Sequence, residues 1–175
     1  MLAENLKEVT EGKLNMTIIT GTFEEGSEWV AKNKEEKNVF MMFGNTMGNF
    51  ENHETVEYCK WMGSVLKKGD QFLFGLDLKK DPTVIQDAYS YSLNKSVVEF
   101  LKNSLRRVNK ELEGTFDEEK FYVHTYFDPY EGAEICCMIS TEDQTAKVGE
   151  KEISFKTYES IEVLYSRKWS KKQIS

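Results

Sequence analysis

The sequence predicts an α/β fold in which an open, doubly wound sheet is followed by an α+β insertion. Three strand patterns alternate with two helical patterns, in the order 16–23, 24–37, 39–43, 54–67 and 72–78. This βαβαβ order is typical of a doubly wound sheet. After Lys79 the pattern changes, because a largely helical stretch from Thr83 to Leu112 precedes β-rich sequence from Phe121 onward. The 175 residues suffice for one domain or a domain and a half.

The first three elements are predicted from local composition. Leu2–Glu11 has the pattern of the end of a helix. Met16–Phe23 (MTIITGTF) is rich in β-branched residues, which favours a strand. Glu24–Lys37 is a charged helical stretch that carries Trp29 and Val30.

The next strand ends in two glycine–asparagine pairs. Val39–Phe43 is a run of consecutive apolar residues, which predicts a strand covered on both faces. Gly44, Asn45, Gly48 and Asn49 then form a loop that can take positive φ and bring the backbone close to a ligand. In open α/β sheets the ligand crevice lies at this carboxyl end of the strands. A plain strand with a tight turn is the alternative.

The remaining elements follow from periodicity. An amphipathic helix against the sheet is predicted from apolar residues at helical spacing, namely Val56, Cys59, Met62 and Leu66. The apolar repeat from Val97 to Leu112 predicts helix, and Asn94–Ser96 interrupts the helical stretch, so two helices are expected. β-structure is expected over 121–128, 133–140 and 151–169.

Composition excludes several functional classes. Apolar residues make up 39% and charged residues 30%, as in an ordinary globular protein. The net charge of −7 argues against a nucleic-acid partner. No apolar run approaches the roughly 20 residues that span a bilayer, and no secretory signal is visible, so a cytoplasmic protein without membrane attachment is expected. Cys59, Cys136 and Cys137 suggest no disulfide framework, and His53 and His124 form no metal-binding pattern.

Four blocks of sequence carry a resemblance to a known family. They are GNTMGNF (44–50), GDQFLFGLDLKKD (69–81), Ala88–Tyr89 and VNKEL (108–112). In this order and spacing they resemble the histidine-specific methyltransferase family, from about Leu2 to Trp169. That family includes the ergothioneine-pathway enzyme, which trimethylates the α-amine of histidine with S-adenosylmethionine (SAM).

The resemblance implies a partial Rossmann-like methyltransferase sheet with an inserted α+β substrate domain. The implied divisions are 1–78 for the partial SAM-methyltransferase domain, 79–161 for the substrate-binding insertion, and 162–175 for the return to the first domain. The implied cofactor is SAM, and the implied partner is a small-molecule amine or amino acid. No G-x-G motif occurs, and the chain stops soon after Trp169. The sequence therefore looks like the middle-to-late part of a longer enzyme.

Three residues match cofactor positions of the family. Thr22 and Phe23 fall where the family has an acidic residue followed by an aromatic at the adenine. Phe23 can still pack on the ring, whereas Thr22 lacks the carboxylate, so weaker adenine recognition is expected. Gly44 matches a glycine whose backbone approaches the cofactor. An ordinary core residue is the alternative for Phe23, and a turn glycine is compatible with the role of Gly44.

Three further residues match substrate positions. Asn49 matches an asparagine that contacts the α-amine, with an N-cap of the next helix as the alternative. Tyr89 matches a tyrosine that binds the substrate carboxylate, with a half-buried amphipathic tyrosine as the alternative. Ser96 falls near a hydroxyl position that lines the same pocket. No catalytic side chain is assigned, because methyl transfer from a sulfonium chiefly needs an amine held in line with the methyl carbon.

The clearest departure from the family lies near the end of the chain. By strand alternation Leu164 and Ser166 share a face, opposite Val163 and Tyr165. The histidine-specific members have glutamate and serine there, both hydrogen-bonded to the imidazole. Leu164 cannot accept that N–H, and an unpaired buried donor costs roughly 1–3 kcal/mol. Ile135 also stands near a pocket-wall position.

Two hypotheses about function follow. The first is a SAM-dependent N-methyltransferase that acts on the α-amine of an amino acid or related small amine other than histidine, with a less polar or larger side chain. The alternative is a catalytically inactive fragment or remnant that retains only a substrate-type binding domain. The missing glycine-rich motif, Thr22 and Leu164 favour the second. The first is favoured by the four retained residues, namely Gly44, Asn49, Tyr89 and Ser166.

Overall fold

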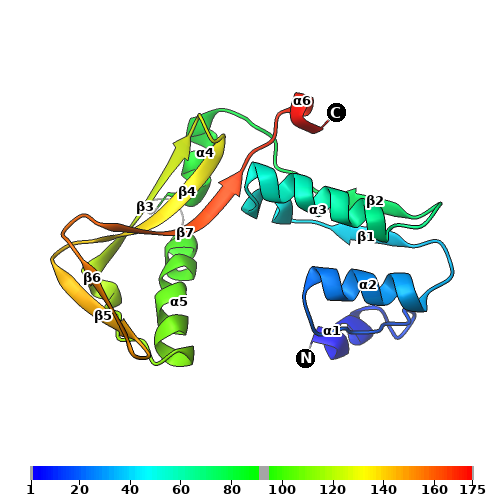
Figure 1. The fold of residues 1–175 in the computed structure, drawn as a ribbon, viewed down its shortest axis with the longest axis horizontal. Coiled ribbons are helices and arrows are strands. Elements are labelled where there is room, and N and C mark those ends of the chain that lie inside the picture. The colour runs from blue at the N-terminus through cyan, green and yellow to red at the C-terminus, as the bar shows by residue number, and fades with distance from the viewer. Residues whose placement is uncertain (1, 91–94, 175) are drawn as a thin grey trace. The chain divides into compact units, whose positions relative to one another are not determined.

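A computed structural model describes residues 2–90 and 95–174 as a mixture of helices and short sheets (Figure 1). The helices are α1 (Leu2–Val9), α2 (Phe23–Asn33), η1 (Thr46–Asn49), α3 (Asn52–Val65), α4 (Pro82–Tyr89), α5 (Lys95–Glu111), η2 (Glu118–Lys120) and α6 (Lys171–Ile174). The strands are β1 (Val39–Met42), β2 (Gln71–Phe74), β3 (Phe121–Asp128), β4 (Ala133–Ser140), β5 (Gln144–Val148), β6 (Lys151–Phe155) and β7 (Ser160–Arg167). The α/β class is confirmed.

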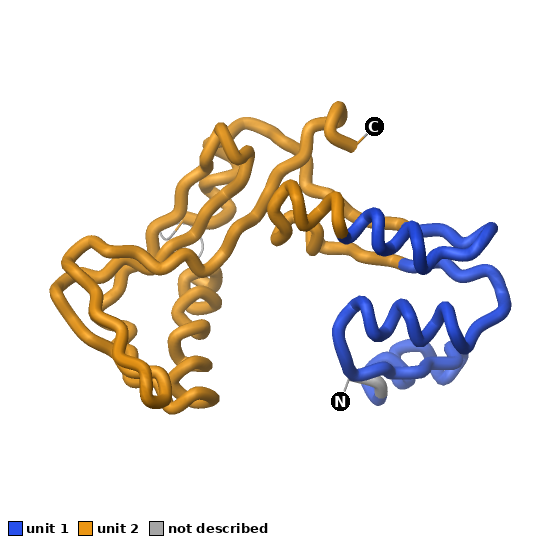
Figure 2. Tube along the Cα trace, in the orientation of Figure 1, with its two compact units in different colours: residues 1–40, 58–72 blue, residues 41–57, 73–175 orange. Residues whose placement is uncertain are grey.

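Two compact units divide the chain (Figure 2). The smaller unit is Met1–Phe40 with Tyr58–Phe72, and the larger is Met41–Glu57 with Leu73–Ser175. The domain boundaries predicted after residues 78 and 161 come from the family resemblance, whereas these two units are defined by compactness. The predicted boundaries therefore stay a prediction. No helix within the two described ranges is long and apolar enough to cross a membrane.

β1, α3 and β2 form a parallel β-α-β unit. The Gln71 N–H donates to Asn38 O at 2.9 Å, and the Gly75 N–H donates to Met42 O at 2.8 Å. Donor and acceptor advance together along the two strands, which is the parallel pattern. The crossover through α3 is the connection that parallel neighbours require. The predicted strand–helix–strand order over 39–78 is therefore confirmed, with β2 ending at Phe74.

The predicted strand at Met16–Phe23 is wrong. Residues 15–20 have no regular structure, and α2 begins at Phe23. Thr22 is the N-cap of α2: the Glu25 N–H donates to Thr22 Oγ1 at 3.2 Å, and the Thr22 N–H donates to Glu25 Oε2 at 2.8 Å. β-branched residues form a strand only beside another strand, and none pairs with this segment within residues 2–90 and 95–174. The predicted βαβαβ order is thus reduced to βαβ.

The prediction that Val39–Phe43 is covered on both faces is also wrong. Met42 is buried, but Val39, Met41 and Phe43 are 47%, 60% and 60% exposed. Side chains alternate along a strand, so these three share one face, and only the opposite face is packed. On α3 the buried positions are Thr55, Tyr58 and Met62 rather than the predicted set, of which only Met62 is buried.

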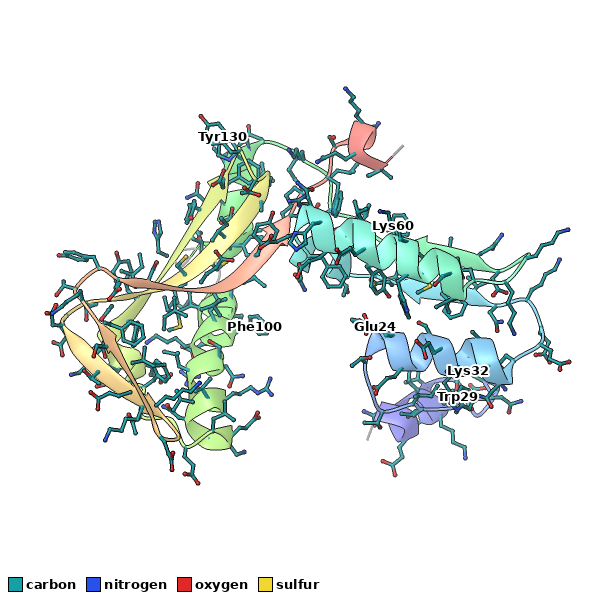
Figure 3. All side chains as sticks on the ribbon, viewed as in Figure 1. Glu24, Trp29, Lys32, Lys60, Phe100 and Tyr130 are labelled. Carbon is teal, nitrogen blue, oxygen red and sulfur yellow. The ribbon has the colours of Figure 1, made fainter. Side chains whose placement is uncertain are left out.

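The larger unit contains an antiparallel sheet that packs against α5. Its strand order is β3-β4-β7, and β5 pairs separately with β6. Leu105 of α5 belongs to a core cluster with residues of four strands, namely Phe121, Met138, Ala146 and Phe155. Phe100 on the same helix is 66% exposed and lies outside this core (Figure 3). The helix predicted from the apolar repeat over 97–112 is confirmed as α5. The three predicted β segments are confirmed too, the third of them as two strands, β6 and β7, whereas β5 had no prediction.

The helical region between residues 83 and 112 forms two helices, as predicted. α4 ends at Tyr89 and α5 starts at Lys95. Asn94, part of the predicted interruption, lies outside the described residues. Lys95 and Ser96 belong to the first turn of α5 rather than to a break.

Candidate functional site

A cavity of about 530 Å³ lies within the larger unit. Ten residues from four segments line it, namely Gly44, Asn45, Asn49, Gly75, Leu76, Asp77, Tyr89, Leu164, Ser166 and Lys168. Five of the ten are predicted site residues, which come from η1 and its loop, from α4 and from β7. The structure therefore brings most of the predicted substrate positions and Gly44 together at one place.

The loop after β1 has the left-handed backbone that the glycine–asparagine pairs predict. Gly44 has φ +74° and Asn45 has φ +58°. Gly48 is needed for packing, because a Cβ there would lie 2.1 Å from Asn45 Nδ2. The missing side chain at Gly48 thus leaves room for the side chain of Asn45. This turn carries the chain from the end of β1 into η1 at the rim of the cavity.

The side chain of Asn45 links its own loop to two other segments of the site by hydrogen bonds. Its Oδ1 accepts a hydrogen bond from the Asp77 N–H at 2.9 Å, and its Nδ2 donates to Arg167 O at 3.1 Å. A longer contact of 3.5 Å joins Nδ2 to Ser166 Oγ. The loop after β1, the segment after β2 and the end of β7 are thereby held in register. Sequence reasoning treated Asn45 only as a turn residue, although its place in a left-handed turn could have flagged it.

Leu164 and Ser166 share a face of β7, as predicted, and both line the cavity. Their partners on β4 are Cys136 and Glu134. Ile135 pairs with Tyr165, which places Ile135 on the opposite face of the sheet. The expectation that Ile135 stands on the pocket wall is therefore wrong, because alternation along β4 turns it away from Ser166.

A lysine that sequence reasoning missed links the hydroxyl groups of the site. Lys168 is 1% exposed. Its Nζ donates to Ser166 Oγ at 2.9 Å and to Tyr89 Oη at 3.1 Å, and it pairs with Asp77 Oδ2 at 3.3 Å. Tyr89 Oη and Ser166 Oγ are themselves 3.0 Å apart. The alternation that predicted Leu164 and Ser166 on one face continues to Lys168, and this signal could have identified it.

The charges around Lys168 are unusual. Burial raises the pKa of Asp77, but the hydrogen bond from Lys80 and the charge of Lys168 outweigh it, so the pKa lies below its ordinary value. Glu134 is fully buried, and burial raises its pKa to about 7 against the opposing charge of Lys168. Burial also raises the pKa of the Cys136 thiol to about 12, so this thiol stays protonated and is no nucleophile.

Asn49 is the last residue of η1 and is exposed at the cavity. The alternative role as N-cap of the next helix is wrong, because α3 begins at Asn52 and the Thr55 N–H donates to Glu51 O at 2.9 Å. The Asn49 side chain forms no hydrogen bond with any other described residue. Its amide is therefore free to contact a ligand.

The other predicted residues lie elsewhere. Ser96 is exposed on the first turn of α5 and is not among the residues that line this cavity. Thr22 and Phe23 belong to the smaller unit, where Thr22 caps α2 and Phe23 is 57% exposed. Phe23 is therefore not the core residue that the alternative supposed. The cofactor role of Thr22 and Phe23 and the pocket role of Ser96 stay predictions.

Comparison with known proteins adds a family match over the whole chain. The sequence model of the family described as histidine-specific, SAM-dependent methyltransferase matches residues 1–175. Ergothioneine biosynthesis protein 1 of Neurospora crassa is 26% identical over 159 residues, which cover 89% of this chain and 18% of that protein. The N-methyltransferase fsqC of Aspergillus fumigatus is 28% identical over 159 residues, covering 89% and 42%.

A bacterial relative matches a shorter segment. Histidine N-alpha-methyltransferase of Mycobacterium tuberculosis is 28% identical over 108 residues, which cover 62% of this chain and 33% of that protein. The chain thus spans less than half the length of each of these relatives.

Proposed function

We propose, from the premise that the chain belongs to the histidine-specific, SAM-dependent methyltransferase family, that it transfers a methyl group from SAM to the α-amine of an amino acid or related small amine. One observation carries this proposal. A single cavity is lined by five residues at positions that resemble family site positions, of which Leu164 departs from the family in residue type, namely Gly44, Asn49, Tyr89, Leu164 and Ser166.

The position of the cavity supports a Rossmann-like reading of the sheet. Gly44 lies two residues after the end of β1, and Gly75 directly follows β2, so the cavity lies at the carboxyl ends of two parallel strands. Ligands of open α/β sheets bind at this edge. We propose that β1, α3 and β2 belong to a Rossmann-like sheet and that residues 79–161 form the inserted substrate-binding part.

The residues at the end of β1 fit a cofactor that needs a close backbone approach. Gly44 is exposed with a left-handed φ, and a Cβ added there would meet no atom within 4 Å, so the backbone stands open. When bound, SAM would supply an electrophilic methyl group on its sulfonium. The chain's own residues would hold the amine in line with that carbon, which is the main requirement of such a transfer.

The substrate side divides into three parts. The free amide of Asn49 would accept a hydrogen bond from the α-amine and orient its lone pair. Tyr89, held by Lys168, would donate to the carboxylate. Leu164 presents an apolar surface to the substrate side chain and offers no acceptor for an imidazole N–H. The proposed substrate therefore has a less polar or larger side chain than histidine, such as an aromatic one.

A methyl-transfer assay tests the proposal. The chain is incubated with SAM and single amino acids, and S-adenosylhomocysteine is measured. We expect kcat/KM for phenylalanine or tryptophan to exceed that for histidine by about tenfold or more. The reason is that the imidazole N–H of histidine would be buried without an acceptor, which costs roughly 1–3 kcal/mol. Asn49→Ala should abolish most turnover, whereas Asn103→Ala, an exposed position on α5, should not. A clear preference for histidine would refute the substrate assignment.

A second candidate is a catalytically inactive chain that binds an amino acid without cofactor. It is favoured by Thr22, whose hydroxyl is occupied in the capping box of α2 and replaces a carboxylate of the family. Titration with S-adenosylhomocysteine separates the two candidates. Micromolar binding supports the methyltransferase, and a folded chain that gives no heat supports the inactive candidate. The cytoplasmic location and the absence of a nucleic-acid partner stay predictions.

A further inference from the structure

All three ammonium hydrogens of Lys168 are engaged inside the candidate site. Its Nζ lies 2.9 Å from Ser166 Oγ, 3.1 Å from Tyr89 Oη and 3.3 Å from Asp77 Oδ2. An ammonium group has three donors and no acceptor. These three contacts therefore use all of its donors, and Lys168 acts on a ligand through its neighbours.

The two hydroxyl groups can consequently present only a donor to the cavity. Tyr89 Oη and Ser166 Oγ each accept from Lys168, Asn45 Nδ2 lies 3.5 Å from Ser166 Oγ as a further donor, and the two hydroxyl oxygens lie 3.0 Å apart. With the bond between the two hydroxyl groups, these contacts occupy all four lone pairs of the two oxygens. One hydroxyl hydrogen joins the pair, whichever of the two donates it. The other hydroxyl hydrogen has no acceptor among the described residues, and both side chains line the cavity. A ligand atom that meets this pair must accept a hydrogen bond.

The local charge favours an anionic acceptor. Lys168 shares Asp77 with Lys80, whose Nζ lies 2.8 Å from Asp77 Oδ1, so two cations face one anion. Glu134 lies on the same face as Ser166, but its pKa is raised to about 7, so it is mostly neutral at pH 6. One positive charge thus remains uncompensated beside the cavity.

We propose that Lys168 is a positioning residue that makes the Tyr89–Ser166 end of the cavity select a carboxylate over a neutral group. The inference rests on the proposed function, because it assumes that the cavity takes an amino acid. It also changes the role expected for Ser166. Its hydroxyl serves the carboxylate end with Tyr89, so of these two β7 residues Leu164 is the one that faces the substrate side chain.

The test compares two probes that differ at one group. L-phenylalanine and L-phenylalaninamide are titrated calorimetrically into the full chain at pH 6, below the pKa of an α-amine. We expect the wild-type chain to bind phenylalanine about tenfold more tightly, the worth of one charge-assisted hydrogen bond. In Lys168→Met the preference should fall below about twofold, because the hydroxyl pair can then also accept and the charge is lost.

Two sets of variants separate this role from a structural one. Lys102→Met removes a lysine that pairs with Glu119 away from this cavity, so it should keep the tenfold preference. Tyr89→Phe and Ser166→Ala should each lower the preference in part, because each variant removes one of the two hydroxyl groups that Lys168 holds and leaves the other. The double variant Tyr89→Phe/Ser166→Ala should lose the preference for phenylalanine over phenylalaninamide. If circular dichroism shows that Lys168→Met does not fold, the double variant takes its place in the test.

The outcomes are distinct. Equal binding of the two probes by the wild-type chain, or a folded Lys168→Met that keeps the tenfold preference, overturns the role of Lys168 and leaves the proposed function standing. If the wild-type chain binds neither probe, the proposed function fails and this inference fails with it.

Discussion

The residues proposed for the substrate and those predicted for the adenine differ in how the chain holds them. Asn45, Tyr89, Ser166 and Lys168 are joined by contacts that span 77 to 122 residues of sequence. Among the described residues Thr22, by contrast, forms hydrogen bonds only with Glu25 and Gly26, three and four residues away, and Phe23 is largely exposed. The residues proposed for the substrate are therefore held in place by tertiary contacts, whereas the residues predicted for the adenine are held by a local helix cap.

The largest effect is expected when the side chain of Asn45, which links segments distant in sequence, is removed. Asn45→Ala deletes hydrogen bonds to Asp77 and Arg167 and places alanine at φ +58°, so we expect a loss of about 3 kcal/mol in unfolding free energy. Asn33→Ala deletes only a local bond from Nδ2 to Trp29 O and should cost less than about 1 kcal/mol. Urea unfolding measures both, and similar losses would contradict the contrast.

The pH dependence of the unfolding free energy tests the role of Glu134, which is buried beside the residues proposed for the substrate. The pKa of Glu134 is raised to about 7 in the folded chain from an ordinary 4.5, so the folded state holds its proton more strongly than the unfolded state. The stabilisation is complete below pH 4.5 and is lost as pH rises through 7, and it amounts to about 2 kcal/mol between pH 5 and pH 8. Glu134→Gln should remove this component of the pH dependence. A variant whose stability falls like that of the wild type would show that Glu134 is not the group concerned.

Leu164 offers a test of specificity on the substrate side. Leu164→Glu restores an acceptor for an imidazole N–H, and we expect the ratio of kcat/KM for histidine to that for phenylalanine to rise about tenfold. Tyr130→Glu adds the same charge at a position that is 97% exposed at the β3–β4 turn (Figure 3) and should leave the ratio unchanged. An unchanged ratio in Leu164→Glu would argue that the substrate side chain lies elsewhere.

The smallest expected effect is at the adenine position. Thr22→Asp restores the acidic residue of the family, and aspartate is an equally good N-cap, so α2 should persist. We expect S-adenosylhomocysteine to bind about threefold more tightly, as one added exposed hydrogen bond allows. Thr17→Asp, at an exposed position without a cap, is the control. Equal affinity in all three chains would remove Thr22 from the cofactor site.

Local pattern sufficed for much of the fold. The apolar repeat of α5 and the β segments after Phe121 formed as predicted, because periodicity of 3.6 or 2 reports directly on a packed face. It failed at Met16–Phe23, where β-branched residues lacked a partner strand and the Thr22 cap prevailed. It failed also for the burial of β1, because the coverage of a strand depends on elements distant in sequence.

The sequence by itself determined the left-handed turn at Gly44 and Asn45 and the shared face of Leu164 and Ser166, since glycine–asparagine pairs and strand alternation act over a few residues. Only the tertiary structure decided that Asn45, Asp77 and Lys168 meet there. A turn asparagine, an aspartate and a lysine are common surface residues in sequence. They acquire a role because folding closes long loops and buries the ammonium group among acceptors, which no local pattern encodes.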